Sequence, residues 1–137
     1  MSKILFITDQ HFGARGDSVS FYDYQSKFYT NIVLPYIDEH DIKIAFDLGD
    51  TFDRRKYINF HTLKAAKSMW FDPLRARGVE LWSIVGNHTA YFKNTNEVNT
   101  MELLFSDYPN MKIISGPRTE LFDGLRVAFL PWICSGN

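Results

Sequence analysis

The chain has 137 residues, of which 45% are hydrophobic, and its formal net charge is −1. That length predicts one domain, residues 1–137, with a sizeable buried core. The charge excludes a polycation, so any nucleic-acid contact must come from local patches. The single cysteine, Cys134, excludes an internal disulfide. Because no apolar run approaches the roughly 20 residues that span a bilayer, we expect a soluble, cytoplasmic protein.

Apolar runs rich in β-forming side chains predict buried strands in the first two thirds of the chain. They cover residues 3–8, 43–48 and 79–85. Shorter runs at residues 111–114, 120–122 and 125–130 also indicate strands. Asp123-Gly124 joins the last two and is a strong hairpin signal.

Helical patterns separate these strands. The first helix begins near Ser18 or Ser20, and Pro35 is expected to kink or end it. Its apolar stripe consists of Phe21, Tyr24, Phe28 and Ile32.

Two further helices follow the second and third strands. Asn59 is a plausible cap for one of them and Gly78 its stop, while Asn99 and Glu102 form a capping-box variant before residues 100–107. The order β-α-β-α-β-α and then strands predicts an α/β fold. We expect a mostly parallel sheet with helical crossovers, followed by antiparallel strands.

Polar side chains follow each of the first three predicted strands. Asp50 comes directly after residues 43–48, Asp9 and His11 follow the first strand, and Asn87 and His88 follow the third. The carboxyl ends of parallel strands meet at one edge of a sheet, which is where open α/β sheets place their chemistry. Carboxylate, imidazole and amide groups converging there predict a site for divalent metal ions.

Each of these motifs has a plain structural alternative when it is taken alone. Asp9 and His11 are two residues apart, so an extended segment would point both to the same side, but such a pair also occurs in exposed turns. Asp50 could cap a loop, and Gly86-Asn87-His88 could be a simple turn. The metal prediction therefore depends on the three motifs occurring together.

In their order, Asp-x-His, Gly-Asp-x-x-Asp-Arg and Gly-Asn-His, the motifs resemble the calcineurin-like metallophosphoesterases over the first ninety or so residues. Residues 51–55 and the tail Phe129-Leu130-Pro131-Trp132-Ile133 resemble the SbcD-like nuclease subunit of the double-strand-break repair complex and the recombination endonuclease of tailed phages. The resemblance implies a metallophosphoesterase-type sandwich and a DNA nuclease with two Mn²⁺ ions. It also implies a role in recombination and repair, a bacterial or phage-infected host cell, and an SMC-like (SbcC-like) ATPase partner.

The same resemblance assigns roles to individual residues. Asp9 and His11 would bind the first ion, Asp50 would bridge both ions, and Asn87 would bind the second. His88 would be the catalytic residue that faces the scissile phosphate. Asp53 is expected to support a ligand or to form a salt bridge rather than to bind an ion itself.

Two departures from the family pattern affect these expectations. Thr89 stands where the family normally places an acid that orients the imidazole, so His88 would be a poorer acid. The family completes its metal shells with three later histidines, which this sequence lacks. We therefore expect a fragment of a longer nuclease, truncated before its last metal-ligand strands. A natural short form with incomplete ion binding is the alternative, and activity of the 137-residue chain alone stays open.

Other residues are candidates for contacts with DNA or with a second subunit. The DNA candidates are Arg54, Arg55 and Lys56 after the second strand, and Tyr91 and Lys93 after the third. For the group after the second strand, the alternative is salt bridges with nearby acids. For the group after the third strand, the alternative is packing of an aromatic ring in the core. In the family, helices from this region pair two subunits, so a homodimer is expected through the helix containing Met69, Trp70 and Phe71, with simple core packing as the alternative.

Two other functions compete with the nuclease. A phosphatase or small phosphodiesterase of the same superfamily would share the motifs, although Arg55 and Thr89 differ from the usual phosphatase residues. A non-catalytic scaffold could keep the fold and lose turnover. A comparison of phosphate-monoester hydrolysis with hydrolysis of single-stranded DNA would distinguish a phosphatase from a nuclease. Manganese titration would identify a scaffold.

Overall fold

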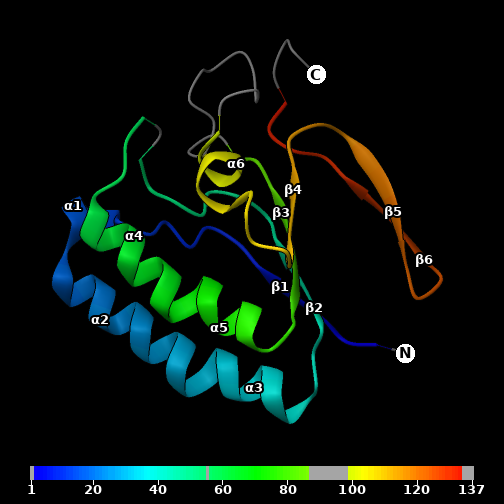
Figure 1. The fold of residues 1–137 in the computed structure, drawn as a ribbon, viewed down its shortest axis with the longest axis horizontal. Helices are drawn as coiled ribbons and strands as arrows, with labels where there is room; N and C mark the ends of the chain where they lie inside the picture. Colours follow the sequence, from blue (N-terminus) through cyan, green and yellow to red (C-terminus); the bar gives the residue numbers. More distant parts are fainter. Residues whose placement is uncertain (1, 55, 87–98, 134–137) are drawn as a thin grey trace.

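The computed structural model describes residues 2–54, 56–86 and 99–133, and its centre is a four-stranded parallel sheet (Figure 1). The strands lie in the order β1 (Ile4–Ile7), β2 (Ile44–Asp47), β3 (Glu80–Ile84) and β4 (Met111–Ile114). A separate antiparallel hairpin consists of β5 (Arg118–Phe122) and β6 (Leu125–Phe129). The prediction of an α/β fold with a parallel sheet, helical crossovers and following antiparallel strands is confirmed.

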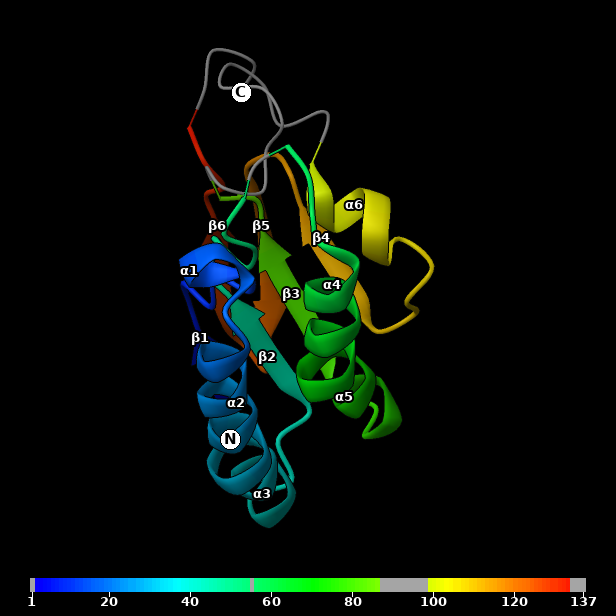
Figure 2. The ribbon, with the colours of Figure 1, turned by 90° about the vertical axis from the view of Figure 1, so that its left-hand side faces the viewer.

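The parallel sheet separates two apolar clusters. Successive side chains of a strand point to opposite faces, so Ala45 belongs to the larger cluster with the helices while Phe46 faces the hairpin. On the hairpin side, the rings of Phe46 and Phe122 are 4.9 Å apart, and the Trp82 ring stacks on Phe129 at 5.6 Å. Figure 2 shows the helices in front of the sheet and the hairpin behind it. The domain therefore has three layers, and the site described below lies at one end of the middle layer.

Two long helices cover the first face, and each contains a π-helical segment just before a proline. The elements are α2 (Val19–Phe28), η1 (Tyr29–Val33) and α3 (Leu34–Glu39), then α4 (Phe60–Ala66), η2 (Lys67–Phe71) and α5 (Asp72–Ala76). Pro35 and Pro73 follow η1 and η2 by two residues. Because a π turn widens the backbone ring, it makes room where proline has no N–H and would strike the preceding turn. Pro35 therefore does not end the first helix.

The apolar stripe predicted for that helix faces solvent instead of the core. Tyr24 is 74% exposed, Phe28 46% and Ile32 60%, and only Phe21 of the stripe is half-buried. The buried side chains of this helix are those of Tyr29, Val33, Leu34 and Ile37. Both faces of the helix are apolar, so periodicity alone does not choose between them. The Tyr29 face is buried because its ring packs on Trp70 and its hydroxyl accepts a hydrogen bond from Gln10.

Met69, Trp70 and Phe71 are core residues. Their exposures are 4%, 0% and 1%, and the Phe71 ring stacks on Phe105 with centroids 4.1 Å apart. Core packing, the alternative, therefore holds for these three side chains, and a homodimer through other residues of this helix stays a prediction.

The predicted caps and the hairpin turn are present. The Asn59 side chain accepts hydrogen bonds at the start of α4, and Asn99 accepts one from the Glu102 amide at the start of α6 (Thr100–Phe105). Asp123 and Gly124 both have positive φ, as a tight hairpin turn requires. Within the described residues, no helix has the length and apolar character that a membrane span needs.

The segment after β1 contains the one-turn element α1 (Ala14–Asp17). Its turn is irregular, because Arg15 and Gly16 have left-handed backbone angles. Asp17 also has positive φ, and its carboxylate accepts hydrogen bonds from Arg54 and Thr62. These two contacts tie the first loop of the chain to the second loop and to α4.

Candidate metal site

The loops that follow β1 and β2 continue the pairing of the two strands. Three backbone N–H groups of the first loop donate to carbonyl groups of the second: Asp9 to Gly49 at 3.0 Å, His11 to Asp50 at 3.0 Å, and Phe12 to Thr51 at 2.8 Å. When the pairing of two parallel strands continues into the loops that follow them, the side chains of the two loops lie next to each other. The backbone therefore brings the Asp-x-His and Gly-Asp motifs to one place.

Three residues of these loops have unusual backbone angles. Asp9, His11 and Asp50 have φ values of 51°, 47° and 53°, in the left-handed region that side chains other than glycine rarely adopt. Each such residue costs about 1–3 kcal/mol, and residues of this kind cluster at functional sites. All three are predicted metal ligands.

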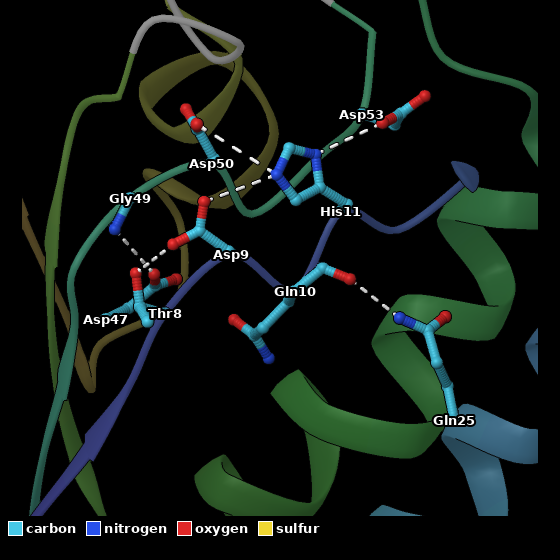
Figure 3. Close-up of polar contacts among 9 residues, drawn as sticks. All are labelled: Thr8, Asp9, Gln10, His11, Gln25, Asp47, Gly49, Asp50 and Asp53. Atoms are coloured by element: carbon cyan, nitrogen blue, oxygen red, sulfur yellow. Dashed lines mark hydrogen bonds and ion pairs between the residues drawn. The ribbon is translucent and has the colours of Figure 1, made fainter. Parts of the chain in front are cut away.

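The side chains of Asp9, His11 and Asp50 form a compact cluster, drawn in Figure 3. His11 Nε2 lies 3.4 Å from Asp9 Oδ1 and 4.0 Å from Asp50 Oδ2. One ligand atom from each residue lies within 4.8 Å of the others. Two atoms that are each about 2.1 Å from a shared ion are at most ~4.2 Å apart, so small side-chain rotations would let these groups hold one ion. Oxygen and imidazole ligands suit a divalent metal such as manganese.

Asp53 lies behind His11. Its Oδ1 is 3.1 Å from His11 Nδ1, on the far side of the ring from the two other carboxylates (Figure 3). The Asp53 amide donates to the carbonyl of Phe12, which fixes this loop against the first. A carboxylate on Nδ1 holds a metal-binding imidazole in the tautomer that leaves Nε2 free for the ion. Asp53 thus contacts His11, and its supporting role toward a bound ion stays a prediction.

Gly86 gives Asp50 the space that it occupies. A Cβ atom on Gly86 would lie 2.4 Å from Asp50 Oδ1 and 2.6 Å from its backbone nitrogen, which is too close for any side chain. Asp50 and Gly86 line an open groove of about 290 Å³, together with Asp9 and the segment Leu130-Pro131-Trp132. The Trp132 amide donates to the Val85 carbonyl at 2.8 Å and anchors that segment. The carboxylates are therefore accessible to an ion and to a phosphate group.

Asp47 is a buried acid beside the site that motif analysis overlooked. It is fully buried at the end of β2, and burial raises the pKa of its carboxyl group from 3.8 to about 6, although hydrogen bonds from Thr51 and Gly49 oppose the shift. The sequence signal for it was a charged residue inside the apolar run 43–48. Such a residue in a buried strand needs a structural reason.

The remaining predicted residues do not join this cluster or lie outside the described part. Arg54 pairs with Asp17 and lies over the Tyr57 ring at 5.0 Å, so its charge is already compensated within the chain. Lys56 is exposed. The predictions for Asn87, His88, Arg55, Tyr91 and Lys93, and the departure at Thr89, fall outside the described residues.

Comparison with known proteins gives one clear sequence relationship. No protein-family profile matches the chain. The chain is 33% identical over 135 residues to a protein named exonuclease subunit 1 of Enterobacteria phage T4. The match covers 98% of this chain and 39% of the phage protein. The chain is thus related to a phage exonuclease subunit and spans about two fifths of its length.

Among solved structures, a protein of unknown function from Aquifex aeolicus resembles the chain with a TM-score of 0.47 and 15% sequence identity. That likeness covers 93% of this chain and 59% of the Aquifex chain.

Proposed function

We propose that the chain is part of a DNA nuclease subunit that hydrolyses phosphodiester bonds at a divalent-metal site of the metallophosphoesterase type. The observation that carries the proposal is the convergence of Asp9, His11 and Asp50, with ligand atoms within 4.8 Å of one another. The similarity to the phage protein named exonuclease subunit 1 supports the same reaction class.

The residues at the site fit manganese in several ways. The donor set is hard oxygen and imidazole, the groove leaves one side of the cluster open, and Gly86 gives the Asp50 carboxylate room beside the chain. Bound divalent ions supply Lewis acidity at the phosphate oxygens and make water a better nucleophile. Two such ions are part of the proposal, and Asp50 would be a ligand of both.

The chain's own groups have distinct tasks in this proposal. Asp9 and Asp50 bring negative charge to the floor of the groove, which attracts cations and without them repels a phosphate. His11 offers Nε2 to the same point, because Asp53 holds its Nδ1. The proposed roles of Asn87 as a ligand and His88 as the group facing the scissile phosphate complete the set.

Partners follow from the proposal and from the relative's name. That relative is called a subunit. We propose that this chain also works in a complex, with DNA as substrate and an SMC-like ATPase as partner, in recombination and repair.

The test is hydrolysis by the purified protein with Mn²⁺. We expect cleavage of single-stranded DNA that exceeds hydrolysis of p-nitrophenyl phosphate, and loss of at least 100-fold in Asp50→Asn, a change that keeps the shape of the side chain and removes its charge. A protein that prefers the monoester would be a phosphatase. Manganese binding without turnover of either substrate would favour the scaffold alternative for this chain, whereas absence of manganese binding would contradict the proposal.

A further inference from the structure

The buried carboxylate of Asp47 contacts the turn that carries Asp50. Its Oδ2 accepts a hydrogen bond from the Thr51 hydroxyl at 2.6 Å, and its Oδ1 accepts one from the Gly49 amide at 3.1 Å. Both donors flank Asp50 in the sequence. Two bonds from one rigid strand end therefore clamp the turn on either side of the proposed bridging ligand.

The clamped turn also determines where the other ligands lie. The carbonyl groups of Gly49, Asp50 and Thr51 accept hydrogen bonds from the amides of the first loop, at 2.8–3.0 Å. Asp50 has φ of 53°, which is unfavourable for a residue with a side chain, so the turn would relax if nothing held it. A change at the clamp would therefore move both loops of the cluster.

A buried carboxylate at position 47 lowers the stability of the folded protein. Its exposure is 0%, and among the described residues no lysine or arginine forms a salt bridge with it. A buried carboxylate without a positively charged partner is destabilising compared with an apolar residue of similar size, even when it accepts hydrogen bonds. A cost of this kind is retained where the group does something that an apolar residue cannot do.

From this geometry we infer that Asp47 and Thr51 are positioning residues of the metal site: the Thr51 hydroxyl bond to Asp47 holds the Gly49-Asp50 turn in the shape that places Asp50 beside Asp9 and His11. The inference rests on the proposed function for its chemical meaning. Neither residue binds the ion in this account, and both act through the turn.

The test compares Thr51→Val, which removes the hydroxyl while keeping the branched shape, with Thr51→Ser, which keeps a hydroxyl. We expect Thr51→Val to weaken Mn²⁺ binding by about 10–100-fold, the usual effect of removing a group that orients a ligand, and Thr51→Ser to stay near the wild type. Binding is read from the electron paramagnetic resonance signal of free Mn²⁺, independently of activity.

Tyr108→Phe is the matched control. It removes another hydroxyl that donates to a carboxylate at 2.6 Å, that of Asp72, which lies on α5 and not in the cluster. We expect this variant to lose stability without any change in Mn²⁺ affinity. Equal loss of stability in the two variants with equal Mn²⁺ affinity would overturn the positioning role.

Hydrogen exchange separates this inference from the proposed function. The amides of His11 and Phe12 donate to the clamped turn, so their exchange should accelerate in Thr51→Val and not in Tyr108→Phe. If the wild type binds no Mn²⁺, the proposed function fails, and the exchange rates still decide whether Thr51 holds the turn. Unchanged exchange at both amides would refute the clamp.

Discussion

Replacing Gly86 by alanine tests whether the site depends on the close approach of two loops. The added Cβ would lie 2.6 Å from the Asp50 backbone nitrogen. Restoring an ordinary contact of about 3.4 Å requires the Asp50 turn to move by ~0.8 Å, because a backbone atom cannot rotate away as a side chain does. Overpacking of this kind costs about 1–3 kcal/mol of folding free energy.

A shift of that size would also separate the predicted ligands. The three ligand atoms lie within 4.8 Å of one another and a shared ion needs them within ~4.2 Å, so any further separation works against binding. We therefore expect Mn²⁺ affinity to fall at least tenfold, and hydrolysis to fall by about 100-fold, as misplacements near 1 Å do in active sites. Calorimetric titration and urea unfolding measure the two effects.

Gly116→Ala is the matched control for this experiment. Among the described residues, nothing lies within 4 Å of a Cβ built on Gly116, and its φ is not in the left-handed range. The substitution should leave stability unchanged or raise it by about 0.4–1 kcal/mol, with unaltered Mn²⁺ binding. If Gly86→Ala matched this control in both stability and affinity, the reasoning about the Asp50 turn would be refuted.

Three further changes probe the surroundings of the site. Asp53→Asn should lower Mn²⁺ affinity by about 10–100-fold in a binding titration, since its carboxylate orients His11; wild-type affinity would argue against that role. The pKa of Asp47 is raised from 3.8 to about 6, so its ionisation disfavours the folded state. The contribution of Asp47 to stability should be fully present below pH 4 and should fall by about 3 kcal/mol as pH rises through 6. Urea unfolding should show that this slope disappears in Asp47→Asn, and its persistence would contradict the assignment. Phe129→Ala, which opens the cluster under the hairpin, should cost about 3–5 kcal/mol by the same method, whereas a loss below 1 kcal/mol would mean that the hairpin contributes little.

The central arrangement was predictable because it depends on local rules. Strand runs that end in Asp9 and Asp50 put both carboxylates at one sheet edge whatever the details of packing. The hairpin turn at Asp123-Gly124 and the Asn59 cap follow from side-chain chemistry within a few residues. Sequence signals that act within a few residues can be read without knowledge of the rest of the fold.

Features that depend on contacts distant in sequence were not predictable in the same way. The first helix has two apolar faces, and only the packing of Tyr29 against Trp70 decides which one is buried. The π segments before Pro35 and Pro73 are tertiary adjustments that no periodicity marks. The role of Gly86 likewise follows from its distance to Asp50, 36 positions earlier in the chain.

The location of bound manganese tests the account most directly. A crystal of the protein soaked with Mn²⁺ should give an anomalous diffraction peak within about 2.2 Å of Asp9, of His11 Nε2 and of an Asp50 oxygen, with Asp53 still on His11 Nδ1. The same peak should be absent in Asp50→Asn. Manganese bound elsewhere, or no peak while the three side chains keep their present contacts, would contradict the existence of a metal site and with it the nuclease proposal.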